Sequence, residues 1–462
     1  MADLPWLKDA CSLVDAFRAG EVSPLEALEA SLDAIKNSKL NAFCYVDEDE
    51  ARKRAANADV SLPFGGVPIG VKQLDAVDGW PYTEASLVFK DRKATYTQTW
   101  LERMKAAGGN PVGQTISSEF GGLNVSVSKI NGVTGNAWDP SKTAGGSSGG
   151  SSTAVAGGLV PIASGGDGGG SIRIPAAFCG LLGMKGTAGR IPRGPNTLIA
   201  PLTVVLGCQA RSVRDVARWY DVCAGYDSRD PYSLPKLHGW EANLGTSELK
   251  GLRAVISPNL GRAVVRDEVA ARVVAAAEAL ARDVGLEIVD VPVQAPELGY
   301  EWAVANLVGL HKDLEGLWPD CKEQLTDEIA FGMMISEQAF NLQVAANVEA
   351  QRTQANEAMA AVFDEADLII SATNPDVAFP AEIGLNLRVG DKQVGPENNG
   401  ALTIPANIVG NPAVSIPVEP LEGLPVGMQI IGRHHTDAQL LDLALAVERE
   451  RPWPLVAPSA PV

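Results

Sequence analysis

Short apolar runs alternate with amphipathic stretches along most of the chain. One stretch starts at a capping box, Ser23-Pro24-Leu25-Glu26, and continues as an apolar stripe of Leu25, Leu28, Leu32 and Ile35. Helices are also predicted over 96–107, 211–224 and 267–284, and from about Asp437 onward. Strands are predicted over 67–72, 110–115, 252–257, 286–291, 367–372 and 426–431. This alternation predicts an α/β fold with a central mixed sheet covered by helices on both faces.

The chain has the composition of one large folded unit. It has 462 residues, of which 46% are hydrophobic and 20% are charged, so it can bury a sizeable core. No polar linker or block of charge divides it, and it shows no internal repeat. We therefore predict a single domain over 1–462.

The charge balance and the cysteines narrow the possible partners. A net charge of −18 disfavours direct nucleic-acid binding, because phosphate contacts need clustered Lys and Arg. The sequence contains neither a secretory-type leader nor a long apolar run, so we expect a cytoplasmic protein without a membrane partner. The six cysteines lie apart and form no C-x-x-C pair, which predicts reduced thiols rather than a zinc site or disulfides. No metal and no other cofactor is predicted.

The strongest compositional bias lies between Thr143 and Arg190, where two glycine-rich loops each hold a serine. A compact enzyme keeps such glycines where the backbone needs positive φ or must lie close to another group. A flexible linker is disfavoured because apolar runs lie within and beside the loops. The stretch lacks both common nucleotide-binding patterns. It does match G-x-S-x-G around Ser147, the elbow pattern of α/β-hydrolases, although glycine-rich sequence produces this pattern by chance.

A lysine, Lys72, ends the predicted strand 67–72. Such a lysine ordinarily extends its charged group to the surface. Because the sequence also contains two serines in glycine-rich loops, a second interpretation of Lys72 is favoured, in which its side chain is buried. Burial lowers the pKa of a lysine, so a buried Lys72 would be neutral and able to act as a base.

Three motifs in order resemble the amidase signature family. They are GVPIGVKQLD around Lys72, GGSSGGS around Ser147, and GGGSIRIPAAFCG around Ser171. Two further segments, 205–217 and 423–432, are also similar to family segments, so the likeness covers most of the chain, with a signature core over about 65–220.

The resemblance implies an amidase that forms an acyl-enzyme through a Ser171-Ser147-Lys72 triad. Ser171 would be the nucleophile, Ser147 the intermediary that follows a cis peptide bond from Gly146, and neutral Lys72 the base. The oxyanion would be held by the backbone N–H groups of Gly168, Gly169, Gly170 and Ser171.

The resemblance also covers two charged residues beside the nucleophile. It implies that Asp167 and Arg173 fix the loop, with recognition of a substrate carboxylate left open for Arg173. Where many relatives have Ser or Thr before the aspartate, this chain has Gly166, so a loop hydrogen bond is expected to be missing.

Several alternatives stay open. A glutaminase subunit of a tRNA-dependent amidotransferase shares the triad, but the acidity of the chain and the segment 195–205 argue against it. An esterase would use Ser147 with His434 or His435, although these histidines lie in a polar turn. The amide itself is not predicted, and a homodimer is one possible assembly.

The predicted helical region 297–365 is a candidate to line the substrate pocket, as the corresponding region does in the family, although core packing is the more usual role of its apolar residues. Glu119 is interpreted as structural, because one carboxylate without a partner is a weak sign of acid–base chemistry. Asn398, Asn399 and Asn407 lie in loop-like sequence that does not determine whether they face the site.

Overall fold

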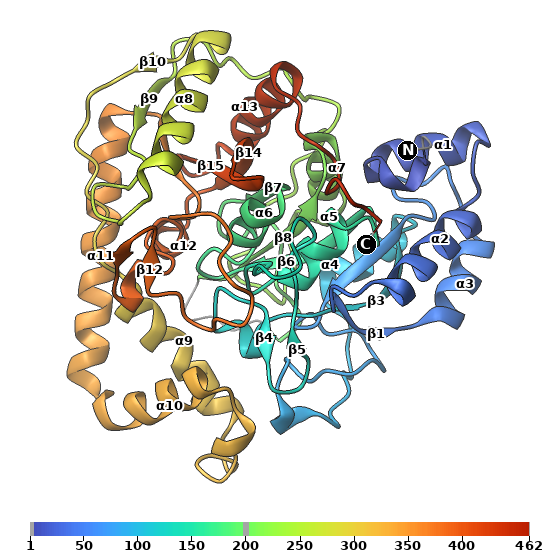
Figure 1. The fold of residues 1–462 in the computed structure, drawn as a ribbon, viewed down its shortest axis with the longest axis horizontal. Coiled ribbons are helices and arrows are strands. Elements are labelled where there is room, and N and C mark those ends of the chain that lie inside the picture. The colour runs from blue at the N-terminus through green and yellow to red at the C-terminus, as the bar shows by residue number, and fades with distance from the viewer. Residues whose placement is uncertain (1–3, 197–202, 462) are drawn as a thin grey trace.

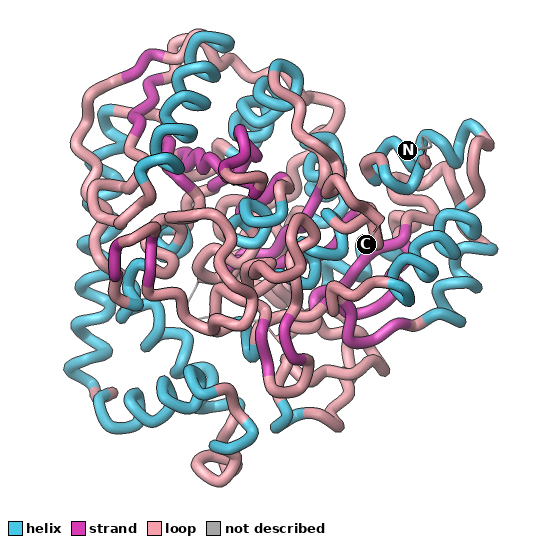
Figure 2. The backbone as a smooth tube through the Cα atoms, viewed as in Figure 1, coloured by secondary structure: helices cyan, strands magenta, loops and turns pink. Residues whose placement is uncertain are grey.

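A computed structural model describes residues 4–196 and 203–461 of the chain. Within these residues, one mixed sheet of eleven strands forms the centre, and helices cover both of its faces (Figures 1 and 2). Its strands, in spatial order, are β1 (Phe43–Val46), β3 (Asn110–Thr115), β2 (Pro68–Lys72), β6 (Ile162–Asp167), β8 (Val205–Ala210), β7 (Leu182–Lys185), β14 (Ala413–Leu421), β15 (Leu424–Gly432), β11 (Leu368–Ala372), β9 (Arg253–Ile256) and β10 (Glu287–Ile288). The predicted fold class is confirmed.

The sheet is mixed because it contains both parallel and antiparallel strand pairs. Strand β2 pairs in parallel with both β3 and β6, whereas β6 pairs antiparallel with β8. Two short hairpins lie outside the sheet, β4 (Val127–Ser128) with β5 (Gly132–Val133) and β12 (Arg388–Val389) with β13 (Lys392–Gln393).

The helices are α1 (Ala10–Ala19), α2 (Pro24–Asn37), α3 (Glu48–Ala56), α4 (Thr99–Ala106), α5 (Gly149–Ala156), α6 (Arg173–Cys179), α7 (Val213–Cys223), α8 (Asp267–Val284), α9 (Gly299–Asp313), α10 (Asp327–Ala339), α11 (Leu342–Glu365), α12 (Ile404–Val409) and α13 (Asp437–Glu450). Helices α9, α10 and α11 lie at the end of the molecule opposite α1, α2 and α3 (Figure 1). The predicted helical region is therefore three helices: a longer connection with a short 3-10 helix, Lys322–Gln324, joins α9 to α10, and a short connection joins α10 to α11.

Capping and periodicity explain the helices that the sequence predicts well. At the start of α2, the Ser23 hydroxyl accepts from the Glu26 N–H at 3.2 Å, and the Glu26 carboxylate accepts from the Ser23 N–H at 2.8 Å. The apolar stripe behind this capping box is buried at Leu28 and Leu32, but Leu25 is 39% exposed. Helix α8 has the predicted bounds, and Gly285 in the left-handed region ends it.

The strands that hold the central loops were not predicted. Strands β6, β7 and β8 are almost entirely buried, so they show no alternation of polar and apolar positions. Glycine in β6 and proline in β14 weaken the strand signal further. The predicted strand 286–291 shrinks to the two residues of β10 at the sheet edge.

Three further features discussed from the sequence are the cysteines, long apolar helices and the segment 195–205. The six cysteines form no disulfide, and Cys44 alone among them is exposed. None of the helices in the described ranges is both long and apolar enough to cross a membrane. The segment 195–205 lies largely at positions outside the described residues.

Candidate active site

Lys72 ends β2 with its side chain enclosed by the protein, and it is 2% exposed. Its Nζ atom lies 2.8 Å from the Ser147 hydroxyl, 2.8 Å from the Ser148 hydroxyl and 3.2 Å from the Gly166 carbonyl oxygen. Burial lowers the pKa of Lys72 to about 8, although the negative charges of Asp75 and Asp167 oppose this shift. The site therefore holds an amine that can lose its proton near neutral pH.

The loop before α5 brings Ser147 to this lysine. The peptide bond between Gly146 and Ser147 is cis. The loop packs so closely that a Cβ atom on Gly146 would lie 2.5 Å from the Val125 nitrogen, which explains why glycine stands there. The Ser147 side chain is buried against Lys72 rather than exposed to solvent.

Ser171 follows β6 across the loop 168–170, and Asp167 organises this loop. The Asp167 carboxylate accepts from the N–H of Gly170 at 2.7 Å and from that of Ile172 at 3.2 Å. Burial alone would raise the pKa of Asp167, but the charge and hydrogen bonds of Arg173 and a hydrogen bond from Asn407 hold it well below its ordinary value. The loop is thus tied to a carboxylate that stays ionised.

The loop leaves three of the four predicted oxyanion donors available. The N–H of Gly170 already donates to Asp167, so Gly170 offers no donor to a substrate, which corrects the predicted set. Among the described residues, no acceptor pairs with the N–H groups of Gly168, Gly169 or Ser171. The Trp302 indole N–H donates to the Gly168 carbonyl at 2.6 Å and so helps to hold the loop.

Arg173 is fully buried and uses its donors inside the protein. It binds Asp167 at 2.9 Å and 3.0 Å, the Gln429 side chain at 2.6 Å, the Thr403 carbonyl at 3.0 Å and the Asn407 side chain at 2.6 Å. A guanidinium that is satisfied in this way has no donor facing a substrate carboxylate. The geometry therefore fits the loop-fixing role and not the alternative.

Residues far along the chain complete this support. Asn407, on α12, donates to the backbone oxygen and the carboxylate of Asp167 at 2.8 Å each. The Thr403 hydroxyl, just before α12, donates to the Gly169 carbonyl at 2.6 Å. Their short polar side chains carry no local motif, so sequence reasoning left Asn407 undecided and did not single out Thr403.

A cavity of about 500 Å³ opens at Ser171. It is lined by Gly121, Gly122, Leu123, Asn124, Gly169, Ser171, Ile174, Glu297, Gly299, Tyr300, Trp302, Ala303, Phe331, Leu385, Pro396, Glu397, Asn399, Gly400 and Ile404. Gly121 connects the cavity with the buried serine, because a Cβ atom there would lie 3.5 Å from the Ser147 hydroxyl oxygen. Helices α9 and α10 contribute to this lining, whereas α11 contributes no described residue.

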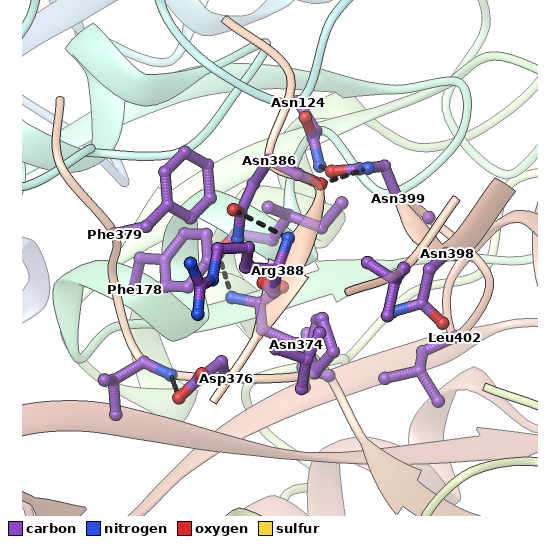
Figure 3. Close-up of a pocket in the computed structure, with 17 residues that line it drawn as sticks. Asn124, Phe178, Asn374, Asp376, Phe379, Asn386, Arg388, Asn398, Asn399 and Leu402 are labelled. Carbon is purple, nitrogen blue, oxygen red and sulfur yellow. Dashed lines mark hydrogen bonds between the residues drawn. The ribbon is translucent and has the colours of Figure 1, made fainter. Parts of the chain in front are cut away.

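A much smaller cavity of about 20 Å³ adjoins the first (Figure 3). The two share Asn124, Ile174, Asn399 and Gly400, and the small cavity does not reach Ser171. At the boundary, the Asn124 amide donates to the Asn399 side-chain oxygen at 3.2 Å, and the Asn399 amide donates to the Asn386 carbonyl at 2.8 Å (Figure 3). Asn399 therefore lies between the two cavities and lines both of them.

The other residues singled out in the sequence are bonded to partners outside the candidate triad. The Glu119 carboxylate accepts from the Thr326 N–H at 2.7 Å, next to the first turn of α10. Asn398 exchanges two hydrogen bonds with the backbone of Val264. His434 is bonded to the Val409 carbonyl at 2.9 Å, and His435 lies beside Arg190.

Gly166, which stands where many relatives have Ser or Thr, lies beside Lys72. The Gly166 carbonyl faces Lys72, whereas a Cβ atom on Gly166 would meet only Leu206, at 3.6 Å. Within the described ranges, no group of three or more His, Cys, Asp and Glu side chains is arranged to hold a metal ion.

The chain belongs to the amidase signature family: the family described as "Amidase" matches residues 26–441. The chain is 32% identical over 470 residues to the acylamidase of Rhodococcus erythropolis, covering 98% of this chain and 97% of that protein. It is equally 32% identical, over 472 residues, to a subunit of the glutamyl-tRNA(Gln) amidotransferase of Chloroflexus aurantiacus, covering 95% of each.

Solved structures agree with this assignment. A bacterial aryl acylamidase superposes with a TM-score of 0.90 at 27% identity and covers 97% of each chain. The 6-aminohexanoate cyclic dimer hydrolase in complex with its substrate superposes with a TM-score of 0.88 at 27% identity, covering 99% of this chain and 100% of that one. The protein is therefore an amide hydrolase of the amidase signature family.

Proposed function

We propose that the chain is an acylamidase-type enzyme that cleaves a carboxylic acid amide through an acyl-enzyme on Ser171, with Ser147 and Lys72 completing the triad. The observation that carries this proposal is the hydrogen bond of 2.8 Å between a buried lysine amine and the Ser147 hydroxyl. Ser171, from the neighbouring loop, lines the substrate cavity. A nucleophile needs an adjacent base, and this arrangement supplies one.

The contacts of Lys72 suggest how it works as a base. A neutral amine has two N–H groups and one lone pair. The Ser148 hydroxyl and the Gly166 carbonyl accept the two N–H groups, which leaves the lone pair for the hydroxyl proton of Ser147. Ser147 in turn takes the proton of Ser171.

Acylation then follows from this proton route. The Ser171 oxygen attacks the carbonyl carbon, its proton passes to Ser147, and the proton of Ser147 passes to Lys72. The protonated Lys72 returns a proton through Ser147 to the leaving nitrogen as the C–N bond breaks. Water then attacks the acyl-enzyme by the same route and releases the acid. We propose that the N–H groups of Gly168, Gly169 and Ser171, which donate to no acceptor among the described residues, stabilise the oxyanion.

The cavity supports a substrate with an apolar acyl or aryl group. Trp302, Ile174 and Ile404 line it. Of its two acidic residues, Glu297 is paired with Arg262, whereas Glu397 forms no ion pair among the described residues. Free glutamine carries a carboxylate that the charge of Glu397 would repel. This observation favours the acylamidase function over the glutaminase alternative, and we propose that the chain acts in the cytoplasm, alone or as a homodimer.

The test is amine or ammonia release from a panel of aliphatic, aromatic, fatty-acyl and amino-acid amides that includes glutamine. Wild type should turn over at least one acyl or aryl amide, and Lys72→Ala and Ser171→Ala should each abolish this turnover. The double variant His434→Ala/His435→Ala should keep full activity, because neither histidine bonds to a serine of the site. Loss of activity in that variant would support the esterase alternative.

Turnover of glutamine in preference to every acyl amide, with a requirement for added amidotransferase subunits, would replace the proposal with the glutaminase function. Activity that survives Lys72→Ala would remove the lysine from the mechanism.

A further inference from the structure

A buried carboxylate that the triad does not use lies three residues after the catalytic lysine. Asp75 is 3% exposed, and its N–H donates to the Lys72 carbonyl at 2.8 Å, so a tight turn folds it back toward the end of β2. Among the described residues, Asp75 forms no ion pair with a Lys, Arg or His side chain. An unpaired buried carboxylate is costly, so its position calls for an explanation.

Ser164 connects Asp75 to the backbone of Lys72. The ladder between β2 and β6 pairs Ile69 with Ile162 and Gly70 with Ala163, and then stops. Beyond this point, the Ser164 hydroxyl oxygen accepts the backbone N–H of Lys72 at 2.8 Å. The same hydroxyl donates its proton to the Asp75 carboxylate at 2.6 Å. The serine side chain therefore continues the link between the strands, and the carboxylate fixes its orientation.

The Asp75–Ser164 link contacts Lys72 at its backbone and not at its amine. It holds the backbone of Lys72, while Ser147, Ser148 and Gly166 hold the amine. Because Gly166 follows Ser164 by two residues on β6, the same strand contacts both ends of the lysine. A shift of this strand would move Lys72 relative to Ser147.

Few charges surround Lys72, so the charge of Asp75 matters. Strand β3 and helix α5, which pack against β2, carry no charged residue, and the charged side chains of α2 lie at or near the surface. On β6 the single charged residue is Asp167, whose charge is paired with Arg173 at 2.9 Å. Lys185, on β7, acts on Asp167 and is not among the charges that shift Lys72. Asp75 is thus the unpaired anion near the base.

We propose that Asp75 is a positioning residue of the amidase reaction: through Ser164 it fixes the backbone of Lys72, and its negative charge sets the pH at which Lys72 becomes a base. This inference rests on the proposed function, because it requires Lys72 to be the base. The anion stabilises the protonated lysine and so opposes the effect of burial. The enzyme then keeps a base that recovers its proton readily for the leaving nitrogen.

The test compares the pH dependence of kcat/KM for wild type and Asp75→Asn, with the best amide of the panel. Removing the anion should move the acid limb to lower pH by roughly one unit, the scale that a nearby charge produces. Relative to each enzyme's own plateau, activity below the limb should therefore rise about tenfold. A purely structural role would lower the plateau and leave the limb where it is.

Two further variants keep the test decisive. Ser164→Ala retains the carboxylate but removes the link, so it should lower kcat across the pH range. It should also move the limb in the same direction by less, because the Ser164 hydrogen bond lowers the pKa of Asp75 and its loss leaves this group less ionised. If Asp75→Asn does not fold, this variant carries the test. Ser152→Ala is the matched control, because Ser152 is a buried serine on α5 whose hydroxyl has no partner among the described residues. It should change neither limb nor plateau.

The outcomes separate this inference from the proposed function. Acid limbs that stay at the wild-type position in both Asp75→Asn and Ser164→Ala, while Lys72→Ala is inactive, overturn the inference alone. An upward shift in Asp75→Asn also overturns it. Activity that survives Lys72→Ala overturns the proposed function, and the inference with it.

Discussion

Replacing Arg173 with methionine should destabilise the protein strongly. The Arg173–Asp167 pair is fully buried on both sides, and methionine keeps most of the volume but removes the cation. Removing one partner of a buried ion pair typically costs about 3–5 kcal/mol, because the other charge stays buried and uncompensated. Asp167 keeps donors from Gly170, Ile172 and Asn407, so we expect a loss of about 3 kcal/mol, at the lower end of this range.

The measurement is the free energy of unfolding in urea, followed by tryptophan fluorescence. Arg352→Met is a matched control, because Arg352 pairs at 3.1 Å with Glu349, whose side chain is 72% exposed, and such pairs contribute less than about 1 kcal/mol. The double variant Asp167→Asn/Arg173→Met should be more stable than the sum of its single changes predicts, because it leaves no unpaired charge. A loss in Arg173→Met no larger than in Arg352→Met would refute this reasoning.

Three further predictions concern the site. The kcat/KM of wild type should rise with pH through about 8, because burial lowers the pKa of Lys72 to about 8 and the base acts in its deprotonated form; a pH profile flat from 6 to 9 would contradict this. Gly170→Ala should lower kcat at least about tenfold, because Gly170 has φ of 129° and an added Cβ atom would lie 2.4 Å from the Thr403 hydroxyl oxygen. Gly166→Ser is the control and should keep most of the activity, so equal kinetics of the two variants would count against the loop geometry. Glu397→Gln should lower KM for amides that carry a carboxylate and leave KM for neutral amides unchanged, which initial rates on a matched substrate pair would decide.

The sequence predicted those parts of the fold that local patterns determine. The capping box at Ser23 and the periodicity of α8 are local signals, and both are present in the structure. Strand β2 was predicted because a short apolar run ends at a charged residue. Strands β6, β7 and β8 were missed because central strands that are buried on both faces have no polar alternation.

The candidate site divides in the same way. Lys72, Ser147 and Ser171 belong to motifs, and the structure brings Lys72 and Ser147 into hydrogen-bond contact. Asn407 contacts Asp167 across 240 positions of sequence, and no local pattern indicates such a contact. The N–H of Gly170 was assigned to the oxyanion because sequence cannot show that a neighbouring carboxylate already binds it.

The central claim is that Ser171 carries the acyl group during amide cleavage. The most direct measurement is mass spectrometry of protein that has been acid-quenched during turnover of the best amide, followed by peptide mapping. We predict an added mass equal to the acyl group on the peptide that contains Ser171 in the wild type, and no adduct in Ser171→Ala or Lys72→Ala. An adduct on Ser147, or turnover by Ser171→Ala, would contradict the account.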